Sequence, residues 1–252
     1  MLRLLCVTAH PDDEAGGFGG SLLVYRARGV ETFVVCLTPG QAARNRGGAK
    51  NDAELSAVRR EEFARACKIL NISRGEVLDY PDAALDRQDF QAVAGVLVRR
   101  IREIRPQVVA TFGAEGAITA HPDHTMASLL ATAAYHWAGR SNRFTDQLDA
   151  GLKPHRAQKL YYASALATIP DYPQPVSLAP VTTVIDIGAQ NLDTKIAAFA
   201  AHTSQNPLLP RFEATMRDRG PVERFHLAAT TTPRMAGTAV ETDLFAGVRE
   251  DE

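Results

Sequence analysis

Two short clusters of histidines and carboxylates stand behind apolar runs in this chain of 252 residues. The first, at positions 10–14, reads His-Pro-Asp-Asp-Glu and follows the apolar run at 4–7. The second, at 121–124, reads His-Pro-Asp-His and follows the apolar run at 108–112. An aliphatic run that ends in such residues is typical of a buried strand that carries chemistry at its tip. Because imidazole and carboxylate groups are common ligands of zinc, the clusters predict a metal site.

The chemistry that such a site supports is hydrolysis by activated water. A catalytic zinc takes three protein ligands and leaves one position open, where bound water ionises near pH ~7. A neighbouring carboxylate can act as general base, and a protonated histidine can stabilise the oxyanion and protonate the leaving group. Asp12 and Asp13 are adjacent and can face opposite ways, so one can bind the metal while the other stays free. The spacing leaves open which of them does which.

Two other interpretations compete with this one. Asp12 and Asp13 could cap a helix, because a helix N-terminus favours acidic groups; the presence of a second cluster makes this the weaker interpretation. The glycines at 16–20 suggest a dinucleotide-binding turn, but a GxGxxG pattern started at Gly17 meets Leu22 where it needs glycine. These glycines also follow the His-Asp cluster instead of the strand itself. A dinucleotide-dependent oxidoreductase is therefore disfavoured.

Alternating apolar and helical segments in the first half predict the elements that position the two clusters. We expect strands at 2–9, 31–38, 76–80 and 107–112, and helices within 16–28, 54–70, 89–104 and 126–137. This rhythm predicts an α/β fold: a Rossmann-like parallel sheet with core order 3-2-1-4 and helices on both faces. Such sheets bind ligands at the switch point between strands 1 and 4, so the two clusters should meet there.

The second half is less regular and predicts an irregular C-terminal extension. We expect strands at 160–164 and 181–187, a Pro-rich excursion between them, helices at 192–202 and 211–219, and a short element at 223–227. The tail from Thr230 is rich in Thr, Gly and Ala and is expected to be poorly ordered. Because no repeat or linker interrupts the chain, we expect residues 1–252 to form a single domain.

The charge and apolar content of the chain limit the classes of partner that it is expected to bind. The formal net charge of -1 and pI of about 6.7 give no electrostatic reason to expect nucleic acid or an anionic membrane. No apolar stretch approaches the ~18–20 residues of a membrane span, and the first residues do not have the pattern of a signal peptide. We therefore expect a cytoplasmic protein that acts on a small molecule and that could form a homo-oligomer.

The two clusters together resemble the LmbE-like family, the zinc-dependent N-acetylglucosaminyl deacetylases. Four further segments resemble landmarks of that family and occur in the family's order; they lie at 58–63, 79–82, 105–109 and 201–205. Relatives act on N-acetylglucosaminyl-phosphatidylinositol, on sugar precursors of mycothiol and bacillithiol, and on chitin fragments. The resemblance implies a zinc hydrolase that removes an acetyl group from an N-acetylated amino sugar.

The resemblance also implies a role for individual residues. Zinc would be bound by His10, Asp13 and His124, although the same donors accept other divalent metals such as Fe²⁺. Asp12 would be the general base, and a charged His121 would stabilise the oxyanion and serve the leaving amine. The remaining implied roles concern residues around these groups: Asp123 would orient His121, Arg59 and Asp82 would hold sugar hydroxyls, and His202 occupies a frequent family position that a packed or capping histidine could equally fill.

Two alternatives of function stay open. An amidase acting on a larger thiol-sugar conjugate would need a wide pocket, which the loops at 39–52 and 139–158 could form. Some thiol-biosynthesis deacetylases have a tyrosine where this chain has Thr119, which argues against a direct assignment to mycothiol-type substrates. The second alternative is a non-catalytic sugar- or nucleotide-binding protein on the same fold. The presence of Asp12 and His121 favours an enzyme, because binding alone needs neither residue.

Overall fold

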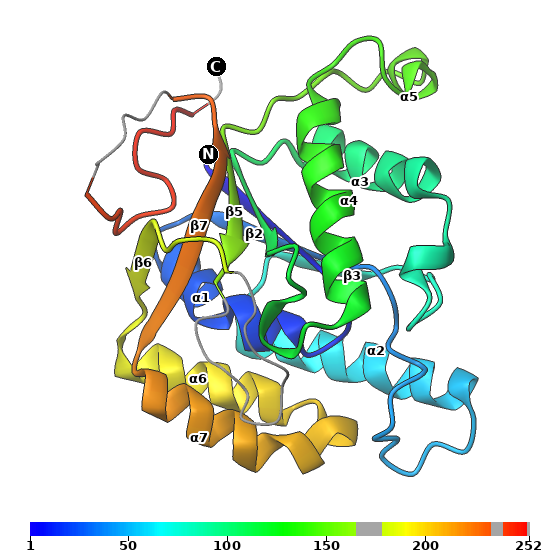
Figure 1. The fold of residues 1–252 in the computed structure, drawn as a ribbon, viewed down its shortest axis with the longest axis vertical. Helices are drawn as coiled ribbons and strands as arrows, with labels where there is room; N and C mark the ends of the chain where they lie inside the picture. Colours follow the sequence, from blue (N-terminus) through cyan, green and yellow to red (C-terminus); the bar gives the residue numbers. More distant parts are fainter. Residues whose placement is uncertain (165–177, 233–238, 251–252) are drawn as a thin grey trace.

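The computed structural model describes residues 1–164, 178–232 and 239–250. Its centre is a seven-stranded sheet in the order β3-β2-β1-β4-β5-β7-β6 (Figure 1). The strands are β1 (Arg3–Thr8), β2 (Glu31–Cys36), β3 (Arg74–Val77), β4 (Val108–Phe112), β5 (Lys159–Ala163), β6 (Thr183–Asp186) and β7 (Val222–Thr230). The predicted core order 3-2-1-4 is confirmed, and β5 extends this parallel core on the far side of β4.

Helices cover both faces of the sheet, as predicted (Figure 1). The helices α3 (Phe90–Ile104) and α4 (Pro122–Ala138) pack together on one face. The other face carries α1 (Gly19–Ala27), α2 (Asp52–Ile69), α6 (Gly188–Ala200) and α7 (Leu209–Arg219), with α6 packed against the other three. Shorter turns complete the chain: η1 (Glu14–Phe18), η2 (Leu85–Arg87), η3 (Ala117–Thr119), α5 (Thr145–Asp149) and η4 (Thr203–Leu208).

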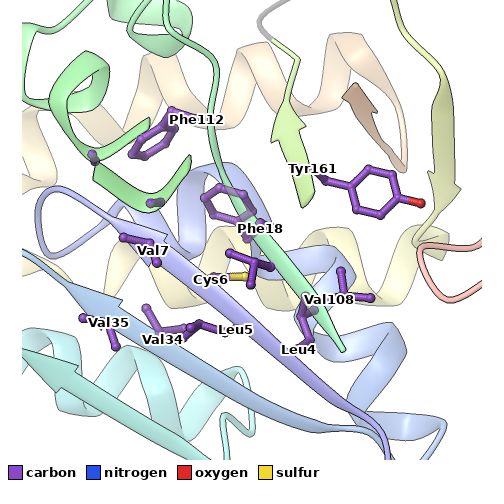
Figure 2. Packing of buried hydrophobic residues seen from close by; sticks show 14 of the residues in the cluster. Leu4, Leu5, Cys6, Val7, Phe18, Val34, Val35, Val108, Phe112 and Tyr161 are labelled. Atoms are coloured by element: carbon purple, nitrogen blue, oxygen red, sulfur yellow. The ribbon is translucent and has the colours of Figure 1, made fainter. Parts of the chain in front are cut away.

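The core lies on both sides of β1 and β4. Leu4, Leu5 and Val7 are buried, and every residue of β4 is buried. Figure 2 shows these strands packed around the Phe18 ring and beside Val34 and Val35 of β2. A parallel sheet covered on both faces needs apolar residues on both, which explains the continuous apolar runs of the sequence. Because these strands are buried, the polar residues that follow them are held at the edge of the sheet.

Several predicted boundaries shift. The strand expected at 76–80 is Arg74–Val77, because its pairing starts where Arg74 faces Phe33 of β2. The helix expected from 126 begins at Pro122, so the second cluster forms its first turn instead of a loop. Proline suits that position because its fixed φ is helical and its missing N–H has no partner to lose there. This shift places the cluster on a rigid element.

The second half is more ordered than expected. The short element at 223–227 is the nine-residue strand β7, which pairs antiparallel with both β5 and β6. The tail expected to be poorly ordered is docked where the structure describes it: Leu244 and Phe245 are buried, and the Phe245 ring lies 5.1 Å from that of Tyr25. Most of the expected Pro-rich excursion lies outside the described residues. Among the described helices, none is long and apolar enough to cross a membrane.

Candidate metal centre

The two His-Asp clusters meet at the ends of β1 and β4, which are adjacent parallel strands. The ring centroids of His10 and His121 are 4.8 Å apart, and that of His124 lies 5.3 Å from His10 and 5.2 Å from His121. One ring nitrogen from each histidine lies within 4.8 Å of the other two, a spacing at which a metal ion could be held. The topology therefore brings together residues that are more than a hundred positions apart.

Asp13 lies between two of these imidazoles. Its Oδ1 is 3.1 Å from His124 Nε2, and its Oδ2 is 3.5 Å from His10 Nδ1. Oδ2 also accepts the backbone N–H groups of Ala9 and His10. Burial alone would raise the pKa of Asp13, but His124 and His10 hold that pKa well below its usual range. Although Asp13 precedes η1, its side chain makes no capping hydrogen bond to it, so the helix-cap interpretation does not describe this residue.

The second ring nitrogens of His10 and His124 lie close to protein oxygen atoms. His124 Nδ1 lies 3.2 Å from the carbonyl oxygen of Gly116. His10 Nε2 lies 3.0 Å from Asp82 Oδ1 and 3.4 Å from Asp123 Oδ2. When a carbonyl or carboxylate oxygen partners one nitrogen of an imidazole ring, the other nitrogen is free to bind a metal ion. His10 Nδ1 and His124 Nε2 both face an Asp13 oxygen, and two imidazole nitrogens with a carboxylate oxygen form a donor set that fits zinc.

Asp12 has an unusual backbone and an arginine as its side-chain partner. Its φ is +110°, a conformation that costs a residue with a side chain about 1–3 kcal/mol. Its Oδ2 accepts a hydrogen bond of 2.9 Å from Arg59 Nη2. Its N–H donates to Glu14 Oε2 at 3.0 Å. Burial raises the pKa of Asp12 to about 6 even though Arg59 opposes this rise. The adjacent carboxylates therefore have different surroundings, a distinction that their spacing could not reveal.

Arg59 and Asp82 are at the site, and their polar atoms contact the protein itself. Arg59 is 3% exposed and also donates to the carbonyl oxygens of Pro11 and Gly40. Gly40 has a φ of +68°, and a side chain there would overlap the guanidinium. Asp82 accepts the N–H of Ala42 at 2.8 Å in addition to its contact with His10. The expectation that both bind sugar hydroxyls stays a prediction.

His121 and Asp123 touch through the backbone. His121 caps α4, because its Nδ1 accepts the Asp123 N–H at 3.2 Å. The Asp123 carboxylate instead accepts the N–H groups of Ala83 and Leu85 and faces His10. Burial and the neighbouring His10 and His124 lower the pKa of His121. The Asp123 carboxylate thus lies beside His10, and the role that the family resemblance implies for it, orienting the His121 ring, stays a prediction.

Glu14 has a part that the sequence analysis did not assign. Its Oε1 lies 2.6 Å from His202 Nε2, and both side chains are fully buried. Although burial alone would lower the pKa of His202, Glu14 raises it. The family resemblance around 201–205 was the one signal for His202, and no local pattern could show its partner 188 positions away. Thr119, at the departure from the thiol-biosynthesis pattern, has a buried hydroxyl without a hydrogen-bond partner among the described residues.

Comparisons with known proteins show the family and the fold of the chain. A family model described as GlcNAc-PI de-N-acetylase (PIG-L) matches residues 5–135. A 1D-myo-inositol 2-acetamido-2-deoxy-alpha-D-glucopyranoside deacetylase of Thermobispora bispora is 30% identical over 305 residues, covering 98% of each chain. A mycothiol S-conjugate amidase of Streptomyces coelicolor is 31% identical over 58% of this chain and 56% of that protein. The N,N'-diacetylchitobiose deacetylase structure from Pyrococcus horikoshii shares the fold, with a TM-score of 0.73 and 23% identity over 89% of this chain and 83% of that one.

Proposed function

Because the chain belongs to the PIG-L (LmbE-like) family of GlcNAc-PI de-N-acetylases, we propose that it removes the acetyl group from an N-acetylated amino sugar. The chain is a hydrolase of amide bonds, as its relatives are. One observation carries the proposal: a three-donor metal cluster lies beside a separate carboxylate, Asp12, that is anchored by Arg59. A protein that only binds a sugar would need no more than the metal donors, whereas hydrolysis needs the metal donors and a separate base such as Asp12.

The cofactor that we propose is zinc, held by His10, Asp13 and His124. A zinc ion there would supply activated water and polarise the amide carbonyl. The donor set supports this choice, since the two imidazole nitrogens and the carboxylate are common zinc ligands. Ferrous iron accepts the same donors, so metal content has to be measured.

We assign the proton transfers to Asp12. Its carboxylate, fixed at Oδ2 by Arg59, takes a proton from the attacking water and returns it to the leaving nitrogen, so the amino sugar leaves uncharged at that step. The Nδ1 of His121 accepts the Asp123 amide, and its Nε2–H is therefore available to the amide oxygen as negative charge develops. The family resemblance implies a charged His121, but this contact favours the neutral ring.

The substrate class rests on the relatives. Deacetylation of an N-acetylglucosaminyl conjugate is the activity in the name of a relative that aligns with 98% of this chain. The amidase relative matches just over half of the chain and makes cleavage of a larger thiol-sugar conjugate the second candidate. Asp82 and Arg59 are the proposed contacts to the sugar in either case.

Release of a free amine by the metal-loaded protein tests the proposal, with acetate measured beside it, because cleavage of the larger amide of a thiol-sugar conjugate releases no acetate. We would compare N-acetylglucosaminyl-inositol, diacetylchitobiose and an S-conjugate of mycothiol, with metal content measured on the same sample. We expect turnover of at least one N-acetylated sugar, loss of turnover after chelation, and recovery with zinc. Cleavage of the S-conjugate alone would favour the amidase. A fully loaded protein that cleaves none of the three would contradict the proposal.

A further inference from the structure

We infer that the buried Glu14–His202 ion pair positions Asp12 for proton transfer, an inference that rests on the proposed function. Glu14 connects the two residues with its two oxygens. Oε2 accepts the Asp12 N–H at 3.0 Å, and Oε1 lies 2.6 Å from His202 Nε2. His202 is therefore a positioning residue that acts through Glu14.

The backbone of Asp12 needs such support. Its φ of +110° lies in a region that residues with side chains rarely adopt, and surrounding contacts must hold it there. Three hydrogen bonds hold it. The Asp12 N–H donates to Glu14 Oε2, the Asp12 carbonyl oxygen accepts from the Gly16 N–H at 2.8 Å, and the Asp12 carboxylate accepts from Arg59. Because this φ sets the direction of the Asp12 side chain, losing a contact should move the carboxylate itself.

The turn after Asp13 explains how Glu14 reaches back. Glu14 begins η1, a single turn of π-helix over Glu14–Phe18. Such wide turns are rare and recur at functional sites. Here the turn places the Glu14 carboxylate under the Asp12 amide, only two positions earlier in the chain. Since Glu14 is 0% exposed, its charge needs a buried partner, and His202 is that partner.

His202 is anchored independently of the site. It precedes η4, and Glu62 of α2 accepts hydrogen bonds from Thr203 Oγ1 and from both the N–H and Oγ of Ser204. His202 Nδ1 has no hydrogen-bond partner among the described residues, so Glu14 receives the ring's one side-chain hydrogen bond there. The ring is thus held by a rigid segment and directed at Glu14. This arrangement connects the C-terminal part of the chain to the proposed base.

Two substitutions separate the hydrogen bond from the volume of the ring. His202→Leu fills the space without a donor, whereas His202→Gln keeps an N–H donor on a side chain of similar reach. Lys195→Met is the matched control, because Lys195 Nζ forms another buried ion pair at 2.5 Å, with Glu223 Oε1. Glu223 accepts the N–H groups of Gly20 and Ser21 at the start of α1, away from Asp12.

We expect His202→Leu to lower kcat on an N-acetylated sugar by about 10- to 100-fold, the order of loss that a misplacement near 1 Å produces. KM and zinc content should stay close to those of the unmodified protein. His202→Gln should recover most of kcat. Lys195→Met should lower Tm while leaving kcat unchanged. Full kcat in His202→Leu, an equal kcat loss in Lys195→Met, or no recovery in His202→Gln would overturn the inference.

A readout without turnover keeps the inference separate from the proposed function. In ¹⁵N-labelled, zinc-loaded protein, the Asp12 amide should be protected from hydrogen exchange by the Glu14 carboxylate. We expect His202→Leu to shift that resonance and to reduce its protection, and Lys195→Met to do neither. An unchanged resonance in His202→Leu contradicts the inference. If the unmodified protein cleaves no N-acetylated sugar, the proposed function fails, while this measurement still decides whether His202 holds Asp12.

Discussion

The two adjacent carboxylates at the end of β1 show what a single residue's surroundings decide. The Asp13 carboxylate faces His10 and His124, whereas the Asp12 carboxylate contacts Arg59. The backbone of Asp12 also has an unusual φ of +110°. The sequence placed both residues at the site because residue type and position suffice for that. It could not assign their roles, because the direction of each side chain depends on a rare φ and on an arginine 47 positions away.

Among single residues, we first predict the effect of removing a metal donor. His124→Ala should abolish tight zinc binding, because three protein ligands leave little redundancy once one is lost. Elemental analysis after dialysis measures the bound zinc. His136→Ala is the matched control, since that histidine is exposed on the same helix. Full zinc occupancy in His124→Ala would exclude His124 as a ligand.

A substitution of Asp82 distinguishes support of a metal ligand from contact with the substrate. Because its Oδ1 lies 3.0 Å from His10 Nε2, we expect Asp82→Asn to weaken zinc binding by about 10- to 100-fold, the usual loss when a ligand's supporting partner is changed. Competition with a chromogenic chelator measures that affinity. Unchanged zinc affinity would contradict this supporting role and leave Asp82 only its proposed contact to the sugar.

Elements decide which of these residues are held rigidly. The strands β1 and β4 were predictable, because continuous apolar runs mark strands that are buried on both faces. The start of α4 at Pro122 was missed, since His, Pro and Asp in sequence read equally well as a loop or as a first helical turn. The π-turn η1 was also missed, because no sequence pattern marks a single wide turn at the start of a glycine-rich segment.

The tie between η1 and the start of η4 predicts a pH dependence of stability. Burial alone would lower the pKa of His202, but Glu14 raises it above the ordinary value of about 6.5. The charged pair therefore stabilises the fold fully below that ordinary pKa, and this contribution disappears as the pH rises through the folded-state value. The gap in unfolding free energy between the unmodified protein and His202→Gln should be larger at pH 6 than at pH 9. Urea denaturation at both pH values measures the gap, and equal gaps would refute the charged pair.

At the scale of the whole molecule, the predicted core order and the location of the cluster at its switch point hold, because parallel crossover rules restrict the possible topologies. The place of β7 between β5 and β6 was not predictable, since it depends on antiparallel pairing between distant segments. The single domain, the cytoplasmic location and a homo-oligomer stay predictions. The docked segment at 239–250 was missed because its few apolar residues have no periodic pattern.

That docked segment gives a prediction about stability alone. Phe245 is 8% exposed and packs against Tyr25 at the end of α1. Phe245→Ala should lower the unfolding free energy by roughly 3 kcal/mol, the lower end of the range for truncating a buried phenylalanine. Its kcat at 25 °C should not change, because the Phe245 ring packs against α1 and not against the metal centre. Thermal unfolding and acetate release on one sample measure both, and a loss of kcat without a loss of Tm would contradict this prediction.

Acetate release by Asp12→Asn, with its bound zinc quantified, tests the proposed roles of Asp12 and Asp13 most directly. The asparagine side chain keeps the shape of the aspartate but cannot take a proton, while His10, Asp13 and His124 remain in place. We predict the same zinc content as in the unmodified protein and a kcat that is lower by at least about 10²-fold, as for loss of a general base. Full activity at equal zinc content, or an empty metal site in this variant, would contradict the division of roles between Asp12 and Asp13.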